Sequence, residues 1–462
     1  MAGRDHLRVT FHGGADGIGG NKVLLEGGGT RVFLDHGQSF SYGARYFAGW
    51  LKPRERFGLR DHFALGLMPK IRGLYSPRAL ARTDLPHEPP AFDAVLLSHV
   101  HFDHVAHLRY VDPKIPVFLG RTTLRVLRSW ETTSPRVDFN AHDYRPFRTG
   151  DSLAVGGWSV EPVHVDHSTP ASYGFVVRTP DGAVAYTGDL RRHGPMGKLT
   201  DDFVEQARKA SPVALICEGT RVAPEEKREN LSEEEVQARA RDVVEDTEHL
   251  VVVTFYNRDV DRIRTYHRVA RETGRVLVVS TRVAHLLRTL ADDPGIDVPD
   301  PRSDPHLAIY RRELARLAAW EEELLDDDKL EVDVLTAWQV HDRQGEIVLH
   351  LDFHHLNELV DVSPRPGSVF VNSTSEPFTE DDVEDAVKDA WLERFNLRRV
   401  QAHASGHASA GEIWEVVERI GPQVVFPVHT EHPEMFAENL DCEVVVPRPG
   451  ETYELRGDKA VS

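Results

Sequence analysis

The sequence is poor in cysteine and has no long apolar run, and each shortage argues against a class of protein. Its 462 residues include only two cysteines, Cys217 and Cys442, and no CxxC pair. Neither a disulfide framework nor a thiolate zinc site is therefore expected. Because no segment approaches the roughly 18 apolar residues of a membrane helix, and because the start of the chain is short and polar, we expect neither a membrane span nor a secretion signal. The expected location is the cytoplasm.

Positive charge is also in short supply. The formal net charge is −19, which counts against a protein that coats nucleic acid through a broad basic face, because such binding neutralises many phosphates. Any contact with a polyanion must therefore be local. The hydrophobic share of 40% and the charged share of 28% are ordinary for a globular protein. The length suits two or three domains.

Two patterns divide the chain. From residue 7 to about residue 220, short strands alternate with turns, whereas after Arg221 helices alternate with buried strands. Ser232 and Glu235 form a capping-box pattern that opens one of these helices, and the alternation predicts a parallel sheet. We therefore expect a first domain in two parts, residues 1–225 and 391–462, with an α/β domain inserted at residues 226–390. The strand, glycine-rich turn, helix and strand that follow one another over residues 399–428 are expected to return the chain to the first sheet.

Two other segments are less regular. A long charged helix is expected at about residues 307–325, as a solvated surface. Residues 39–90 are rich in arginine, proline and aromatics without clear periodicity, and this length without regular structure suggests a lid or a partner surface.

A cluster of metal-binding residue types follows the apolar strand that ends at Leu97. His99, His101, Asp103 and His104 fall within six consecutive residues. Alternate residues of an extended segment point the same way, so His99 and His101 can bind one ion, while the turn that follows directs Asp103 and His104 toward a second. The HxHxDH pattern therefore predicts a site for two metal ions.

This pattern resembles the metallo-β-lactamase superfamily, and three further motifs occur in the order expected for it. Asp35, after an early strand, is similar to the residue that holds the metal loop without binding metal. His167 and Asp189 resemble the third and fourth motifs. The resemblance implies an αββα sandwich in which His99, His101 and His167 bind one zinc, Asp103 and His104 bind the other, and Asp189 bridges both.

Such a pair of Zn²⁺ ions would acidify a shared water and supply hydroxide at neutral pH. Mn²⁺ also accepts histidine and carboxylate ligands and is an alternative. Asp103 is therefore a candidate catalytic residue as well as a ligand.

The second half resembles the β-CASP subgroup, whose members are nucleases of RNA and DNA. Glu218, His407 and His429 are similar to its acidic and histidine motifs. The resemblance implies that His429 completes the second zinc site and that Glu218 bonds the ring of His407. A carboxylate partner would keep that ring charged near neutral pH, so His407 is the candidate general acid for the leaving oxygen.

Within the subgroup, the His-x-Ser-Gly-His segment looks most like the ribonuclease J enzymes. The resemblance implies that His403 and Ser405 bind a substrate phosphate and that Gly406 lets the backbone approach it. A pocket for a terminal phosphate at a fixed distance from the zinc ions implies 5′ to 3′ exonuclease action, with which endonuclease cutting can coexist.

Several alternatives stay open. One is a small-molecule hydrolase of the same fold that opens a lactone or a thioester, another is a DNA nuclease of the same subgroup, and a third is a non-catalytic scaffold. RNA is the expected partner, with single-stranded DNA as the alternative, a second copy in a homodimer as a further candidate, and no membrane. Five arginines near the helix that begins at Val260 either line an RNA channel or belong to an ordinary surface helix; they are Arg258, Arg262, Arg264, Arg268 and Arg271.

Overall fold

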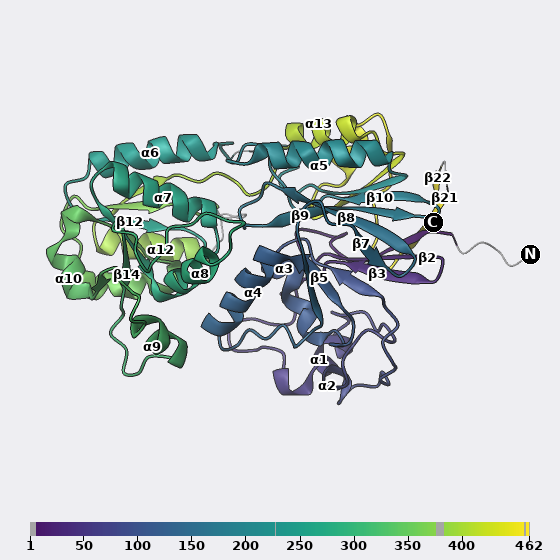
Figure 1. Cartoon of the computed structure of the whole chain (residues 1–462), viewed down its shortest axis with the longest axis horizontal. Coiled ribbons are helices and arrows are strands. Elements are labelled where there is room, and N and C mark those ends of the chain that lie inside the picture. The colour runs from purple at the N-terminus through teal and green to yellow at the C-terminus, as the bar shows by residue number, and fades with distance from the viewer. Residues whose placement is uncertain (1–5, 227, 376–382, 457–458, 462) are drawn as a thin grey trace, which may run out of the picture.

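In the computed structural model, which describes residues 6–226, 228–375, 383–456 and 459–461, the chain forms two bodies that lie side by side (Figure 1). One body is a sandwich of two sheets, built from the two ends of the chain. The other, built from the middle of the chain, contains a third sheet. No helix in the described part of the chain is long and apolar enough to cross a membrane.

The first sheet of the sandwich runs in the order β22-β21-β1-β2-β3-β4-β5-β6 within the described residues. Its strands are β1 (Arg8–Gly13), β2 (Lys22–Gly27), β3 (Thr30–Leu34), β4 (Ala94–Leu96), β5 (Val117–Gly120), β6 (Tyr144–Phe147), β21 (Thr452–Arg456) and β22 (Lys459–Val461). The second sheet runs in the order β20-β19-β11-β10-β9-β8-β7. Its strands are β7 (Leu153–Val155), β8 (Trp158–Val165), β9 (Ser172–Thr179), β10 (Gly182–Tyr186), β11 (Ala214–Glu218), β19 (Val424–Val428) and β20 (Glu443–Val444).

Apolar side chains from alternate positions of both sheets meet between them, as Val9 and Leu25 of the first sheet do with Val160 and Phe426 of the second. Helices α5 (Gly197–Ala210) and α13 (Ala410–Ile420) cover the outer face of the second sheet. Helix α4 (Arg121–Thr133) and the segment with α1 (Arg60–Ala64) and α2 (Pro77–Leu80) cover the outer face of the first. The αββα sandwich expected from the sequence is confirmed.

The third sheet is parallel throughout, in the order β15-β14-β13-β16-β12-β17-β18. Its strands are β12 (Val251–Thr254), β13 (Val276–Ser280), β14 (Leu307–Tyr310), β15 (Val334–Leu335), β16 (Ile347–His350), β17 (Val369–Asn372) and β18 (Arg398–Gln401). One face packs against α6 (Glu233–Glu245), α7 (Val260–Glu272) and α8 (Thr281–Ala291). The other packs against α10 (Ala337–Asp342), α11 (Leu359–Val362) and α12 (Val383–Arg394). Helices on both faces explain why these strands are apolar on both sides.

Two expectations about elements are wrong. Residues 307–310 form strand β14, and the helix of this region is only α9 (Ala319–Leu325). All four residues of β14 are buried, so the third sheet provides a partner that the local pattern did not reveal. Strand β18 pairs with β17 in the third sheet, and the chain returns to the sandwich with β19, which pairs with β11 and β20 in the second sheet and not in the first. Residue 391 lies inside α12. The capping box of Ser232 and Glu235 is present at the start of α6.

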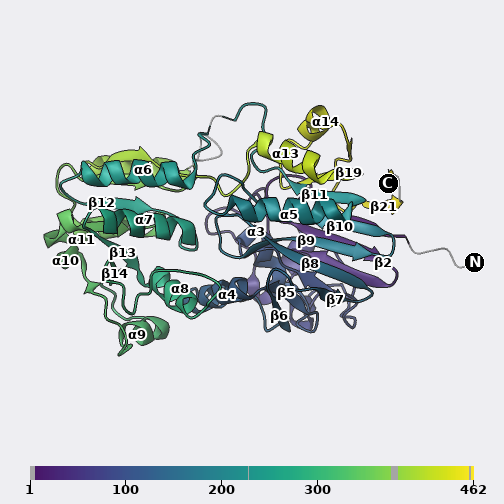
Figure 2. The ribbon, with the colours of Figure 1, turned by 45° about the horizontal axis from the view of Figure 1, so that its top comes forward.

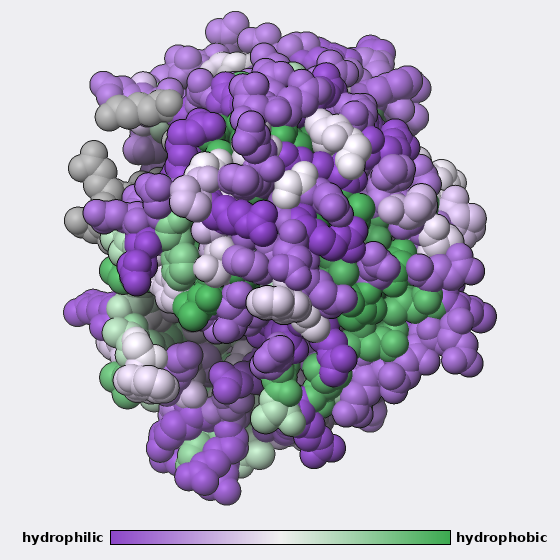
Figure 3. Space-filling model, turned by 90° about the vertical axis from the view of Figure 1, so that its left-hand side faces the viewer, coloured by the Kyte–Doolittle hydropathy of each residue, from purple (hydrophilic) through white to green (hydrophobic). Residues whose placement is uncertain are grey.

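The outer end of the second body is largely hydrophilic, with smaller hydrophobic areas between the polar side chains (Figure 3). The two bodies contact each other where α4 of the sandwich lies beside α8 of the second body, as both ribbon views show (Figures 1 and 2). We call this contact the lower joint, and we call the connection near α5 and α6, at the top of Figure 1, the upper joint. Ser129 of α4 bonds His285 of α8 at 2.8 Å.

Candidate metal centre

The motif residues converge because the strands that precede them end at the same edge of the sandwich. The loop of His99 to His104 follows β4, and His167 follows β8. Asp189, Glu218 and His429 lie at the ends of β10, β11 and β19, which are parallel neighbours in the second sheet. Parallel strands bring their carboxyl ends together, so residues far apart in the chain face one another there.

Asp35 supports the metal loop from below. Its Oδ1 accepts a hydrogen bond from the Ser98 backbone N–H at 2.7 Å, and its Oδ2 accepts from Ser98 Oγ at 2.7 Å. Asp35 Oδ2 also lies 2.7 Å from His104 Nδ1 and 2.7 Å from the Tyr186 hydroxyl. The carboxylate therefore holds the start of the loop and directs the opposite nitrogen of His104 away from itself.

Three imidazole nitrogens meet at the first group of ligands. His99 Nε2 and His167 Nε2 each lie 3.0 Å from His101 Nδ1. The other nitrogen of His99 faces Ser98 Oγ at 3.0 Å, and that of His167 donates to the Gly406 carbonyl at 2.5 Å. Because those partners take the ring protons, unprotonated nitrogens of His99 and His167 point at His101. Asp189 Oδ2 lies 3.5 Å from His99 Nε2 and 3.9 Å from His167 Nε2.

Asp189 also belongs to the second group. Its Oδ2 lies 3.2 Å from His104 Nε2 and 3.8 Å from His429 Nε2. Asp103 Oδ2 lies 2.7 Å from His429 Nε2 and 3.6 Å from His104 Nε2. The ligand atoms of each group all lie within 4.8 Å of one another. The structure thus brings together all seven residues expected to bind metal, with Asp189 between the two groups.

The donor set fits a pair of divalent cations. Both carboxylate oxygens of Asp189 and His104 Nε2 are buried without a hydrogen-bond partner among the described residues. Burial of unpaired polar atoms is costly, and a carboxylate with converging imidazoles is a ligand set that zinc prefers. Burial lowers the pKa of His99 and His101 well below the usual value, and that of His167 to about 4. These rings are therefore neutral at pH 7, as metal ligands must be.

Glu218 and His407 form a buried pair beside these groups. His407 Nδ1 lies 3.0 Å from Glu218 Oε2 and 3.2 Å from Oε1, and 3.9 Å from Asp189 Oδ2. Glu218 is also held by the backbone N–H of Leu190 at 2.7 Å and by the Thr220 hydroxyl at 2.6 Å. Burial raises the pKa of Glu218, but the charge and hydrogen bond of His407 outweigh it and lower the pKa. Glu218 is therefore ionised, and the Nε2 of His407 is free to face a substrate.

Comparison with known proteins agrees with this geometry. Residues 68–235 match the family described as "Beta-lactamase superfamily domain", and residues 394–447 match "Zn-dependent metallo-hydrolase RNA specificity domain". The chain has the metallo-β-lactamase fold and is similar to this superfamily over both matched segments. These two matches and the curated relatives support a β-CASP chain that is similar to ribonuclease J.

Two curated relatives named "Ribonuclease J" illustrate the similarity. One, from Sinorhizobium meliloti, is 27% identical over 73% of this chain, which spans 57% of that protein. Another, from Pyrococcus abyssi, is 24% identical over 98% of both chains. A crystal structure titled "Protein of Unknown Function" from Enterococcus faecalis V583 covers 97% of this chain and is itself covered completely, with 25% identity and a TM-score of 0.78. The fold of this β-CASP chain is thus shared over nearly its whole length.

Three supporting residues of the metallo-β-lactamase site were missed at the sequence level. Ser98 links Asp35 to His99, and Tyr186 donates to Asp35 while accepting from Asn21 at 2.9 Å. Thr220 Oγ1 donates to Glu218 and lies 2.8 Å from His429 Nδ1. Ser98 and Thr220 adjoin motif residues in sequence, but a hydroxyl beside a motif does not by itself reveal which partner it bonds.

Two of the residues expected to bind a phosphate, His403 and Ser405, line a small cavity between the second body and the sandwich. They line it together with Arg221, Arg228, Glu229 and Gln401, and its volume is about 40 Å³. Burial and the charge of Arg262 lower the pKa of His403 to about 3, and its Nδ1 donates to the Ser373 carbonyl at 3.1 Å.

Gly406 also packs closely against the loop that carries His167. A Cβ at this position would lie 2.7 Å from Ser168 Oγ and 3.0 Å from His167 Cε1. The close approach that glycine permits is therefore to the His167 loop, where the Gly406 carbonyl accepts the His167 ring proton.

The arginines near α7 do not act alike. Arg262 is buried and bonds Glu233, Arg264 bonds the Asp297 carbonyl, and Arg268 bonds Gln237. Of the alternatives left by the sequence, these three contacts favour structural roles. Arg258 differs, since its guanidinium stacks on aromatic rings at the joint between the two bodies.

Proposed function

We propose that the chain is a metal-dependent ribonuclease that hydrolyses RNA phosphodiesters at the centre formed by the two ligand groups. The observation that carries this proposal is the Glu218–His407 pair, which lies beside Asp189 at 3.9 Å from the ligand oxygen. A lactone or thioester hydrolase has no need of such a pair, whereas an RNA alkoxide leaves slowly unless it is protonated. The names of the relatives support the same substrate.

Two divalent cations held by His99, His101, His167, Asp103, His104, Asp189 and His429 would supply hydroxide at neutral pH and positive charge for a phosphate. We assign zinc as the metal, with manganese as the alternative. The remaining chemistry belongs to the protein. His407 donates through Nδ1 to Glu218 and delivers a proton to the leaving oxygen through Nε2, while Glu218 holds the ring in this orientation.

The cavity of His403 and Ser405 supports a preference for a 5′-terminal phosphate. Arg221 and Arg228 also line it, and guanidinium groups bind phosphate through paired hydrogen bonds. Because Nδ1 of His403 already donates to Ser373, the ring can donate to a phosphate only after it takes up a proton at Nε2. With a pKa of about 3 the His403 ring is neutral near pH 7, so at that pH the proposed 5′ to 3′ exonuclease mode relies on Arg221, Arg228 and Ser405 for contacts to the phosphate.

The decisive experiment incubates the purified chain with zinc or manganese and one RNA, carrying either a 5′-monophosphate or a 5′-hydroxyl. We expect mononucleotides from the phosphorylated end and slower reaction of the hydroxyl end. Equal rates with internal products would replace the exonuclease mode by an endonuclease mode. Intact RNA together with turnover of a thioester or a lactone would reverse the assignment, and faster cutting of single-stranded DNA would make the chain a DNA nuclease.

The control is Asp103→Ala, which should lose both bound metal and cutting, because Asp103 belongs to the second ligand group. The cytoplasmic location and the homodimer belong to this proposal as predictions. Sedimentation of the purified chain tests the homodimer.

A further inference from the structure

A second cluster of positive charge lies at the lower joint between the two bodies. Arg258, which precedes α7, and Arg282, in the first turn of α8, line one cavity of about 50 Å³ against α4. The polar groups beside them belong to Ser129, Thr133, Ser134 and Asn257, and no carboxylate is among the described residues that line the cavity. Many other arginine side chains among the described residues form ion pairs with carboxylates, whereas the other polar groups that line this cavity are neutral.

Arg258 is held rigidly. Its guanidinium carbon lies 3.7 Å from the centre of the Trp130 ring and 4.5 Å from that of Tyr256, and it bonds the Tyr256 hydroxyl. Its Nε is buried and has no hydrogen-bond partner among the described residues. Stacking fixes the plane of the guanidinium and leaves an N–H available for an acceptor.

Among the described residues, no carboxylate forms an ion pair with Arg258 or Arg282. Burial and the like charge of Arg282 lower the pKa of Arg258, and no carboxylate contributes to that shift. Asp352, which lies beyond Asn257, is already engaged by the Asn257 amide at 3.1 Å and by His355 at 2.7 Å. Two like charges that share a partly dehydrated cavity favour an anion between them. The cavity has room for several groups the size of water, which suits the oxygens of a phosphate.

The position of this cavity relates it to the metal centre. Tyr256 is 39% exposed, and its ring centre lies 5.7 Å from that of His101. The Arg258 guanidinium is therefore at most about 10 Å from the His101 ring, the sum of 4.5 and 5.7 Å. Helices α4 and α8, which enclose the cavity, lie next to each other in Figure 2. A strand bound at the metal centre can thus reach the arginines.

We propose that Arg258 and Arg282 form a phosphate subsite that binds one backbone phosphodiester of the strand whose neighbouring bond is cut at the metal centre. This subsite is separate from the cavity of His403 and Ser405, and it rests on the proposed ribonuclease function. It fits a chain of net charge −19, because it places two positive charges only where a strand must be held. It also gives Arg258 the role in an RNA channel that Arg262, Arg264 and Arg268 do not have.

The test measures binding without cutting. Fluorescence anisotropy with a labelled single-stranded RNA in EDTA compares the wild type with Arg282→Gln, Arg258→Gln and Arg282→Lys. The matched control is Arg136→Gln, which removes the same charge from an exposed position just after α4. We expect Arg282→Gln to raise Kd about tenfold, as for one charge-assisted contact. The slope of log Kd against log salt should fall by about 0.7, and Arg282→Lys should keep most of the affinity.

A second arm uses inorganic phosphate alone and follows Tm. The wild type should gain stability from phosphate, and Arg282→Gln and Arg258→Gln should both lose part of that gain. Wild-type metal content in each variant, before EDTA, shows that it has folded. If both glutamine variants bind RNA with the Kd and salt slope of Arg136→Gln, the subsite does not hold the strand.

The two arms separate the possible failures. Loss of the phosphate effect with unchanged RNA binding would mean that the cavity takes free phosphate, which overturns the strand assignment. If the wild type neither binds nor cuts RNA, the ribonuclease proposal fails and the strand assignment fails with it. An altered phosphate response in the two variants would then identify an anion site of another function. If RNA is cut and bound but neither arm responds to the variants, the subsite alone is wrong.

Discussion

Single hydroxyl groups decide which nitrogen of His99 and of His429 is available at the centre. Thr220 Oγ1 donates its proton to Glu218 at 2.6 Å, so at its 2.8 Å contact with His429 Nδ1 it can only accept. His429 therefore carries its proton on Nδ1 and presents Nε2 to Asp103. One threonine thus couples the ligand His429 to the acid pair of Glu218 and His407.

Thr220→Val tests this coupling because valine keeps the shape of the side chain and removes the hydroxyl. We expect metal affinity to fall by about 10- to 100-fold, as for other partners of ligating histidines. Titration with zinc in a competitive chelator measures the change. Thr220→Ser is the control, since it restores a hydroxyl, and equal affinity in the valine variant would contradict the assigned tautomer.

His407→Ala separates chemistry from metal binding. The His407 ring contacts Glu218, but the two ligand groups that contain His99 and His429 are complete without it. Metal content should stay at the wild-type level while kcat on RNA falls by about 10²- to 10⁴-fold, the usual loss of a general acid. Elemental analysis and single-turnover kinetics measure the two quantities. Full activity would remove His407 from its proposed role.

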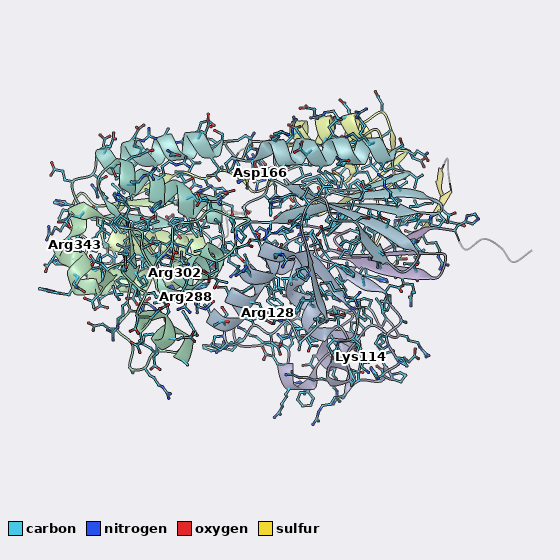
Figure 4. The ribbon with its side chains drawn as sticks, in the orientation of Figure 1. Lys114, Arg128, Asp166, Arg288, Arg302 and Arg343 are labelled. Carbon is cyan, nitrogen blue, oxygen red and sulfur yellow. The ribbon has the colours of Figure 1, made fainter. Side chains whose placement is uncertain are left out.

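At the scale of elements, a buried charge network joins α6 and α7 to the sandwich. Arg191, two residues after Asp189, pairs with Asp166 at 3.0 Å, with Glu233 of α6 at 3.2 Å and with Asp261 of α7 at 2.9 Å. Figure 4 labels Asp166, which lies at the upper joint of the two bodies. Glu233 also pairs with Arg262 at 3.0 Å. The network fixes the inserted helices relative to the strand end that carries Asp189.

Glu233→Gln should lower the free energy of unfolding by about 3 kcal/mol at pH 7, because it removes the carboxylate paired with the buried guanidinium of Arg262 and one of the three paired with Arg191. Urea denaturation measures the loss. Glu234→Gln is the matched control, since Glu234 is the exposed neighbour on the same helix, and a surface change of this kind alters stability by about 0.5 kcal/mol or less. Equal stability of the two variants would show that the network does not hold the joint.

The ion pairs of Glu233 with Arg262 and Arg191 also predict that the free energy of unfolding depends on pH. Burial raises the pKa of Glu233, but the charges of Arg262 and Arg191 outweigh it and lower the pKa to about 2, against an ordinary value of 4.5. A carboxyl group with a lowered folded pKa contributes stability that is present above pH 4.5 and is lost as pH falls toward 2. The stability difference between the wild type and Glu233→Gln should therefore shrink over that window, as urea denaturation at several pH values would measure. A constant difference would contradict the lowered pKa.

At the scale of the whole molecule, the metal centre is also a structural joint. Its ligands come from both sheets of the sandwich and from two ends of the chain, and Asp103 and His429 are separated by 326 residues. An ion that binds only the folded chain stabilises it by mass action, by about 2.7 kcal/mol at a concentration 100 times Kd.

Zinc should therefore raise Tm by about 5 °C over the chelated protein. Differential scanning fluorimetry with zinc, manganese and EDTA measures the shift. Asp189→Ala is the control, because Asp189 belongs to both ligand groups and its loss should abolish the effect. An equal shift in this variant would place the stabilising ion elsewhere.

Elements with strong local signals were predictable from sequence alone. The capping box of Ser232 and Glu235 opens α6 as expected, and the apolar run before His99 is the strand β4. The structure of residues 307–310 could not be predicted in this way, because a short apolar segment is compatible with a helix or a strand. Pairing with the neighbouring strand β13 decided between them. The strand expected near residues 399–403 is present as β18, but which sheet an edge strand joins depends on its partner, here β17.

The amino-acid sequence by itself determined the ligand types and their order along the chain, because HxHxDH after an apolar strand allows few other arrangements. Only the tertiary structure decided which hydroxyl bonds which ring, why Gly406 must lack a side chain, and that Arg258 and Arg282 meet at one cavity. The physical reason is the distance along the chain over which each kind of information acts. Local patterns record which residue types a segment carries, whereas hydrogen bonds and charge pairs between distant strands depend on how those strands are packed.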